Sequence, residues 1–153
     1  KNFVTFYGYK NHIKADTKTK LIEDYIVTDA SVHDSQVIEA LLSEKDRGKP
    51  LYADSAYCGE EQQKVYKKKE VIDRVHEKGY RNKALTEKQK ADNREKSKVR
   101  ARVEHVFGFV ENSMNGSILR TIGIVRANAK IGMMNLVYNI NRCTQLKIQV
   151  SIG

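Results

Sequence analysis

The sequence predicts an α/β or α+β protein in which helices pack over a sheet. Segments rich in β-branched and aromatic residues come first, short strands alternate with helices in the middle, and two long helices close the chain. The chain opens with a hairpin pattern rather than a strand–helix–strand unit, and it has no GxGxxG or GxxxxGK glycine loop. These observations argue against a doubly wound nucleotide-binding fold.

The first third of the chain predicts a hairpin and then a helix. Phe6 to Ile13 and Leu21 to Thr28 have the composition of strands, and the turn residues Asp16 to Thr19 lie between them. The two strands are therefore expected to pair antiparallel. Several N-cap candidates in Asp29 to Asp34 then begin a helix that is expected to run through Leu42.

The middle of the chain predicts short, alternating elements. Leu51 to Ala53 is expected to form a short buried central strand, and a polar helix follows from about Glu60 to Lys69. Val71-Ile72 predicts another short strand. From Glu77 to Glu95 there is little apolar periodicity, which predicts a loop with one helical turn at Thr86 to Ala91.

Two packed helices are expected after this loop. One begins near Ser97, and its apolar face has the spacing i, i+4, i+7, i+8, i+11: Val99, Val103, Val106, Phe107 and Val110. Ser113 to Ser117 breaks this pattern. The last helix is expected over about Arg126 to Gln145, with a packed face of Ile131, Met134, Val137, Tyr138 and Ile140.

Composition sets broad limits on the class of protein. The 153 residues are enough for a single domain over 1–153, and 40% apolar with 31% charged residues is ordinary for a soluble protein. No apolar run reaches the ~18 residues that span a bilayer. Cys58 and Cys143 lack metal-ligand spacing and are expected to be free thiols in a reducing cytoplasm.

The net charge of +9 is concentrated in one stretch. Lys64 to Arg102 holds fifteen Lys or Arg and six Asp or Glu, whereas the remainder of the chain holds thirteen of each sign. This concentration favours a polyanion such as nucleic acid over a membrane, because no basic amphipathic helix with a strong apolar face accompanies it. The alternative is a solvated basic loop.

Two carboxylates stand where metal-dependent phosphoryl transfer would need them. Such chemistry uses two divalent ions about 3.5–4 Å apart, held by Asp or Glu from separate elements. Asp54 follows the predicted strand at its C-terminal end, although a cap of the next helix or the start of a turn explains its position by itself. Glu104 borders the apolar helix face with Arg100 at i−4, although an ordinary helix ion pair explains it as well. The four histidines show no HxH or HxxxH spacing and are expected not to bind metal.

Four segments resemble, in order, the bacterial insertion-sequence DDE transposases of the IS-four and IS-five type. They are the Tyr-Gly-Tyr-Lys strand at residues 6–16, Val-Thr-Asp-Ala-Ser-Val-His-Asp at 27–34, Leu-Tyr-Ala-Asp-Ser-Ala-Tyr at 51–57 and Arg-Ala-Arg-Val-Glu-His-Val-Phe-Gly at 100–108. The resemblance covers nearly the whole chain. It implies a ribonuclease H-like mixed sheet with packed helices, lacking its first strand in this fragment.

The resemblance also implies an Asp, Asp, Glu active site that binds two Mg²⁺ or Mn²⁺ ions. Asp54 matches the second acid, Glu104 the third and Arg100 the Arg four residues earlier, whereas nothing before Tyr7 can be the first Asp. Ser97 and Glu111 stand where the related family pattern has a Tyr and a Lys, so those two accessory roles do not carry over.

The predicted function is that of a transposase that cuts and joins DNA, its own element's ends and a target. Asp54 and Glu104 are expected to approach each other as metal ligands, with Arg100 positioning Glu104 or a phosphate. The predicted contacts to the DNA backbone are Lys64, Lys67, Lys68, Lys69 and Arg102. A nuclease or junction resolvase on the same fold, and a non-enzymatic basic DNA-binding module, are the alternatives. The sequence leaves open whether the protein is a homodimer.

Overall fold

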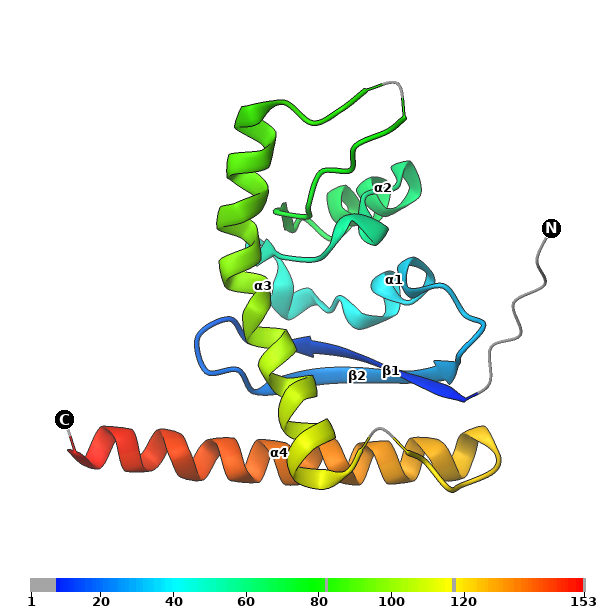
Figure 1. Cartoon of the computed structure of the whole chain (residues 1–153), viewed down its shortest axis with the longest axis vertical. Helices are drawn as coiled ribbons and strands as arrows, with labels where there is room; N and C mark the ends of the chain where they lie inside the picture. Colours follow the sequence, from blue (N-terminus) through cyan, green and yellow to red (C-terminus); the bar gives the residue numbers. More distant parts are fainter. Residues whose placement is uncertain (1–7, 82, 117, 153) are drawn as a thin grey trace. The chain divides into compact units, whose positions relative to one another are not determined.

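The computed structural model describes residues 8–81, 83–116 and 118–152. The described residues form two compact units, the first from residues up to His33 and from Val103 onward, the second from Asp34 to Arg102. Each unit contains strands and helices, as expected for the α/β class (Figure 1).

The first unit begins with the predicted antiparallel hairpin. Strands β1 (Tyr9–Ala15) and β2 (Ile22–Asp29) pair with Tyr9 opposite Asp29. The turn is closed by Asp16, whose Oδ1 accepts hydrogen bonds from the backbone N and the hydroxyl of Thr19 at 2.8 and 2.7 Å. These bonds favour the charged carboxylate and lower its pKa, although partial burial opposes them. Residues 6 and 7, which begin the predicted first strand, lie outside the described residues.

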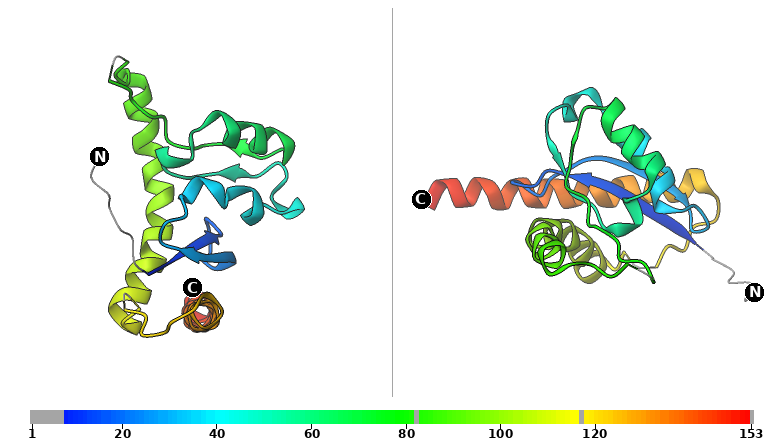
Figure 2. Two further views of the ribbon diagram at one scale, coloured as in Figure 1. Left: turned by 90° about the vertical axis from the view of Figure 1, so that its right-hand side faces the viewer. Right: turned by 90° about the horizontal axis from the view of Figure 1, so that it is seen from above.

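Helix α4 (Ile124–Ile152) also belongs to this unit and packs along the hairpin (Figures 1 and 2). Several of its contacts with the hairpin are polar. Asn139 makes two 2.9 Å bonds to the backbone N and O of Ile22, and the Tyr138 hydroxyl donates to the Lys20 carbonyl at 2.9 Å. Gly132 also lies against the hairpin, because a Cβ there would collide with the Tyr25 hydroxyl.

The core of the first unit lies where α4 meets the hairpin and α3 (Glu87–Met114). Ile22, Val106 and Tyr138 are buried together, and Phe109 meets the Tyr138 ring edge-on at 5.5 Å.

The predicted apolar face of the earlier helix is confirmed: Val106 is buried and its other members are at least half-buried. The prediction for the last helix is partly wrong, because Val137 and Ile140 are exposed. The buried face is set instead by Ala127, Ile131, Asn135 and Tyr138.

The second unit contains the short elements. They are η1 (Asp34–Gln36), α1 (Ile38–Leu41), η2 (Glu44–Asp46), β3 (Pro50–Leu51), η3 (Ser55–Tyr57), α2 (Glu60–Lys68) and β4 (Ile72–Asp73). Its core is formed by Ile38, Leu42, Tyr66 and Val75. The polar helix predicted here is confirmed by α2.

Two expectations for this unit are corrected. The helix expected to begin within Asp29 to Asp34 and to run through Leu42 is divided into η1 and α1, and Val37 at the start of α1 makes no side-chain cap. The strand expected over Leu51 to Ala53 is short as expected, but Leu51 is half-buried rather than buried, and among the described residues β3 pairs only with β4, in parallel. The described residues thus form two two-stranded sheets, β1-β2 and β3-β4.

The loop expected from Glu77 to Glu95 is also corrected, since α3 begins at Glu87. Thr86 caps it: its hydroxyl accepts from Gln89 N at 3.3 Å, and the Gln89 side chain accepts from Thr86 N at 2.9 Å. The first turns of α3 lack apolar periodicity, but they consist of strong helix formers with ion pairs at i, i+3 and i, i+4. A helix that is mostly exposed to solvent has no regular spacing of apolar residues in its sequence.

Candidate functional site

The candidate site begins at the end of a short parallel ladder in the second unit. Backbone hydrogen bonds continue beyond β3 and β4, from Ile72 N to Lys49 O, from Arg74 N to Leu51 O and from His76 N to Ala53 O at 2.9–3.0 Å. Asp54 is the next residue. It therefore follows the C-terminal end of a parallel strand pairing, the position at which α/β sheets commonly carry their sites.

The Asp54 carboxylate has two partners in this unit. Its Oδ1 accepts a 2.8 Å hydrogen bond from Ala56 N and so caps η3, which is the structural role that the sequence left open. Its Oδ2 lies 3.6 Å from Nη1 of Arg100 on α3. The side chains remain 43% and 34% exposed, so this ion pair is in contact with solvent. One carboxylate therefore both shapes its loop and is accessible for chemistry.

A polar face of α3 contacts the ladder and the segment that follows it. Asn93 exchanges two 3.0 Å bonds with the backbone of Glu77, and Lys96 Nζ donates to the Val75 carbonyl at 3.0 Å. Further along the same face are Ser97 and Arg100. The spacing 93, 96, 97, 100 is that of one helix face.

Ser97 contacts a histidine that the sequence gave no role. The Ser97 hydroxyl donates to Asn93 O at 2.8 Å and lies 3.3 Å from Nε2 of His76. Burial lowers the pKa of His76, and the positive charges of Arg100 and Lys96 lower it further. His76 is thus held toward its neutral form beside Asp54 and Arg100. The i, i+3, i+4, i+7 spacing of polar residues is the signal that would have found this face.

The negative charge of Asp54 also affects the pKa of Tyr57, three residues later in the chain. Its pKa is raised to about 12, first by burial and then by the negative charges of Asp34 and Asp54. The ring packs against the core of the second unit, and the backbone carbonyl accepts the Tyr66 hydroxyl at 2.9 Å. Tyr57 therefore remains a neutral phenol that fixes the loop after Asp54.

Glu104 is exposed and lies on α3 one helical turn after Arg100, in the part of the helix that belongs to the first unit. The expected approach of Asp54 and Glu104 stays a prediction. Among the described residues there is no group of three or more His, Cys, Asp or Glu suited to a metal ion. Asp54 and Glu104 each have a carboxylate, the ligand type that Mg²⁺ prefers, and each is at least partly exposed in its own unit.

The predicted DNA-binding residues belong to α2, its C-cap and α3. Lys64 and Lys67 are exposed and make no ion pair with any described residue, whereas Lys68 pairs with Glu39 at 2.8 Å. Lys69 is half-buried as the C-cap of α2, and Arg102 is exposed on α3. The cations are thus unequal, and Lys64, Lys67 and Arg102 are the more accessible.

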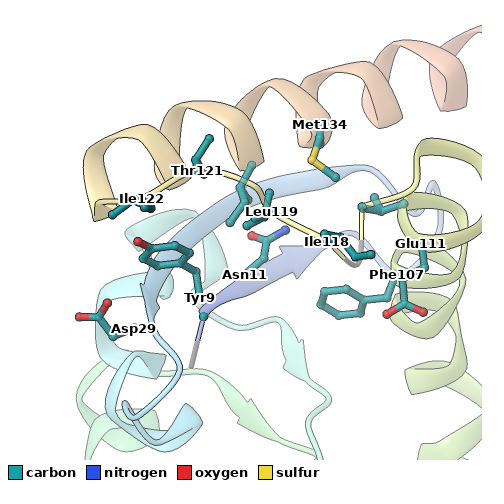
Figure 3. A pocket seen from close by; sticks show the side chains of 14 residues that line it. Tyr9, Asn11, Asp29, Phe107, Glu111, Ile118, Leu119, Thr121, Ile122 and Met134 are labelled. Atoms are coloured by element: carbon teal, nitrogen blue, oxygen red, sulfur yellow. The ribbon is translucent and has the colours of Figure 1, made fainter. Parts of the chain in front are cut away.

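A pocket of about 680 Å³ lies elsewhere, within the first unit (Figure 3). Its wall is mixed: Phe107 and Met134 are among the apolar residues that line it, and Asp29 and Glu111 add two carboxylates. None of Asp54, Arg100 and Glu104 lines it. The candidate catalytic residues therefore do not lie in this pocket, and their side chains are at the solvent-exposed surface instead.

Comparison of the sequence with known proteins identifies the family of this chain. Residues 3–140 match the model of the family described as "Transposase DDE domain". The chain belongs to this family. It is also 29% identical over 140 residues to the "Transposase for insertion sequence element IS1106" of Neisseria meningitidis serogroup B.

The resemblance found in the four motifs is thereby confirmed as that of an insertion-sequence DDE transposase. The aligned part covers 92% of this chain and 48% of the Neisseria protein, so the chain spans about half the length of that curated relative. No solved structure matches the chain significantly. Within the described residues, every helix is too short or too polar to cross a membrane.

Proposed function

We propose that the intact protein cuts DNA at the ends of an insertion sequence and joins those ends to a target, through metal-dependent phosphoryl transfer on a ribonuclease H-like domain. Membership of the DDE transposase family supports the reaction class. The observation that supports the residue assignment is the ion pair between Asp54 and Arg100, which ties the loop after a strand pairing to the helix that carries Glu104.

Asp54 and Glu104 are the proposed metal ligands. The Oδ1 of Asp54 accepts a hydrogen bond from Ala56 N, while its Oδ2 faces the partly exposed guanidinium of Arg100. Glu104 lies one helical turn from that cation and is exposed. Two Mg²⁺ or Mn²⁺ ions, when bound, would supply activation of the attacking oxygen and stabilisation of the leaving oxygen. The four motifs assign no residue of this chain to the family's first Asp.

Arg100 is proposed to have two alternating partners. In the described structure its guanidinium lies beside Asp54, which balances the carboxylate charge. A divalent ion held by Asp54 would repel the guanidinium, and Arg100 would then be available to a DNA phosphate in bidentate geometry. This exchange keeps the site close to neutral before substrate arrives.

DNA is the proposed polyanionic partner. Lys64 and Lys67 on α2 and Arg102 on α3 are exposed cations that would contact phosphates without reading sequence. Lys68 and Lys69 would contribute less, since the first is paired with Glu39 and the second is half-buried. Binding is then driven by release of counterions and weakens steeply with salt.

The test is a strand-transfer assay with the intact protein on DNA carrying the element's ends, comparing wild type with Glu104→Gln. We expect Mg²⁺-dependent joined products from wild type alone, with duplex affinity of the variant unchanged or slightly tighter because a negative charge is removed. Cleavage without any joined product would support a nuclease on the same fold. Metal-independent binding with no chemistry in either protein would support a DNA-binding module and contradict the proposal.

A further inference from the structure

One loop of the second unit presents an aromatic ring to solvent among cations. Tyr80 is 61% exposed, whereas every other tyrosine of the described residues is at least half-buried. Neither its ring nor its hydroxyl has a partner among those residues. Lys78, Arg81 and Lys83 are its neighbours in the sequence and are exposed, and no acidic residue occurs between Lys78 and Thr86. The loop thus combines an unengaged ring with three positive charges.

The backbone of Tyr80 is hydrogen-bonded to another described residue of this loop. Tyr80 and Lys83 form a two-way backbone bridge, with N–O distances of 3.0 Å in both directions. Gly79 packs against Leu85, whose side chain would lie 3.5 Å from a Cβ at that position. The loop leaves the ladder at Val75 and His76 and leads into α3 (Figure 1).

Both ends of the loop are fixed to the first turns of α3. At the entry, the backbone of Glu77 exchanges two bonds with Asn93, and its carboxylate accepts a bond from the Gln89 side chain. At the exit, Thr86 and Gln89 form the helix cap. Gln89 therefore contacts both ends, and the loop geometry is set by the same helix that carries Arg100.

From this arrangement we propose that Tyr80 stacks on an unpaired DNA base while Lys78, Arg81 and Lys83 contact the neighbouring phosphates. An exposed ring gains most by covering a flat apolar surface, and bases offer such a face whatever their identity. Within a duplex both faces of a base are already stacked, so the ring selects a base that is single-stranded or displaced. The inference rests on the proposed function, and it adds a requirement for an unpaired base.

The test measures binding of the 153-residue chain to three kinds of DNA. The first is a fully paired duplex, and the second is the same duplex with a single-stranded end. The third is a series in which one base of the single-stranded end is replaced by an abasic unit, at each position in turn. Wild type should prefer the single-stranded end and lose that preference at one abasic position. Tyr80→Ala should weaken binding to the single-stranded end roughly tenfold and change binding to the paired duplex and to that abasic DNA less than twofold. Because Tyr80 is exposed, the substitution should not disturb folding.

Two matched variants separate stacking from charge. Tyr80→Phe keeps the ring and should bind all three DNAs as wild type does. Lys78→Gln should weaken binding to all three by a similar factor, since each contains phosphates. If Tyr80→Ala weakens every DNA equally, or none, stacking on a base is refuted while the proposed function stands. If wild type binds no DNA at any salt concentration, both the stacking and the DNA-binding part of the proposed function fail.

Discussion

Replacement of Asp54 by Asn should separate the structural from the chemical role of this residue. We expect Asp54→Asn to change the free energy of unfolding by less than about 1 kcal/mol, because Asn caps helices as well as Asp does and keeps the bond from Ala56 N. The lost ion pair to Arg100 is long, at 3.6 Å, and its side chains are 34% and 43% exposed. Solvent-exposed pairs of this kind contribute about 0.2–1 kcal/mol.

The chemical consequence should be far larger than the structural one. A neutral amide does not replace a carboxylate as a ligand for Mg²⁺, so strand transfer by the intact protein should fall below detection with Asp54→Asn. Asp54→Ala serves as the matched control: it loses the cap as well, and its unfolding free energy should drop by about a further 1 kcal/mol. Urea unfolding followed by helical circular dichroism measures both stabilities, provided that the slope of the transition is unchanged.

Two results would refute this reasoning. A loss of more than about 2 kcal/mol with Asp54→Asn would exceed what an exposed ion pair can supply, and would show that the carboxylate is a structural element. Strand transfer at the wild-type rate would show that Asp54 is not a metal ligand. In the second case the bond to Ala56 would be its whole function.

Three further predictions follow from the same contacts. The 153-residue chain alone should show no DNA cleavage with Mg²⁺ or Mn²⁺, since the motifs assign only two of three acids; robust cleavage in a gel assay would contradict that assignment. Reversal of Lys67 to Glu should weaken duplex binding in a salt titration more than reversal of Lys68, which is already paired with Glu39; equal losses would argue against local pairing. Because the folded-state pKa of His76 is lowered, its contribution to stability is present above pH of about 6.5 and is lost as the pH falls below that value. His76→Gln should flatten this part of the pH dependence of the urea midpoint, and an unchanged dependence would show that another group titrates.

Local sequence predicted the elements whose stability is local. The hairpin follows from two β-rich segments around the Asp16 turn, and α2 follows from its helix-forming composition. The face of α3 centred on Val106 was predicted because a helix half-buried in a core carries a 3.6-residue period. Where polar contacts replace apolar ones, this signal fails: α4 docks through Asn135 and Asn139, and its apolar Val137 and Ile140 remain in solvent.

By itself, the sequence determined the family, through four motifs in order, and with it Asp54, Arg100 and Glu104 as the residues of interest. Only the tertiary structure decided that Arg100 meets Asp54, and that His76 and Ser97 stand beside them. The physical reason is that a motif records which residues recur at fixed spacing along one element, and these contacts join a helix to a strand end more than 20 residues away. Such pairings depend on how the ladder and α3 pack, which no local pattern encodes.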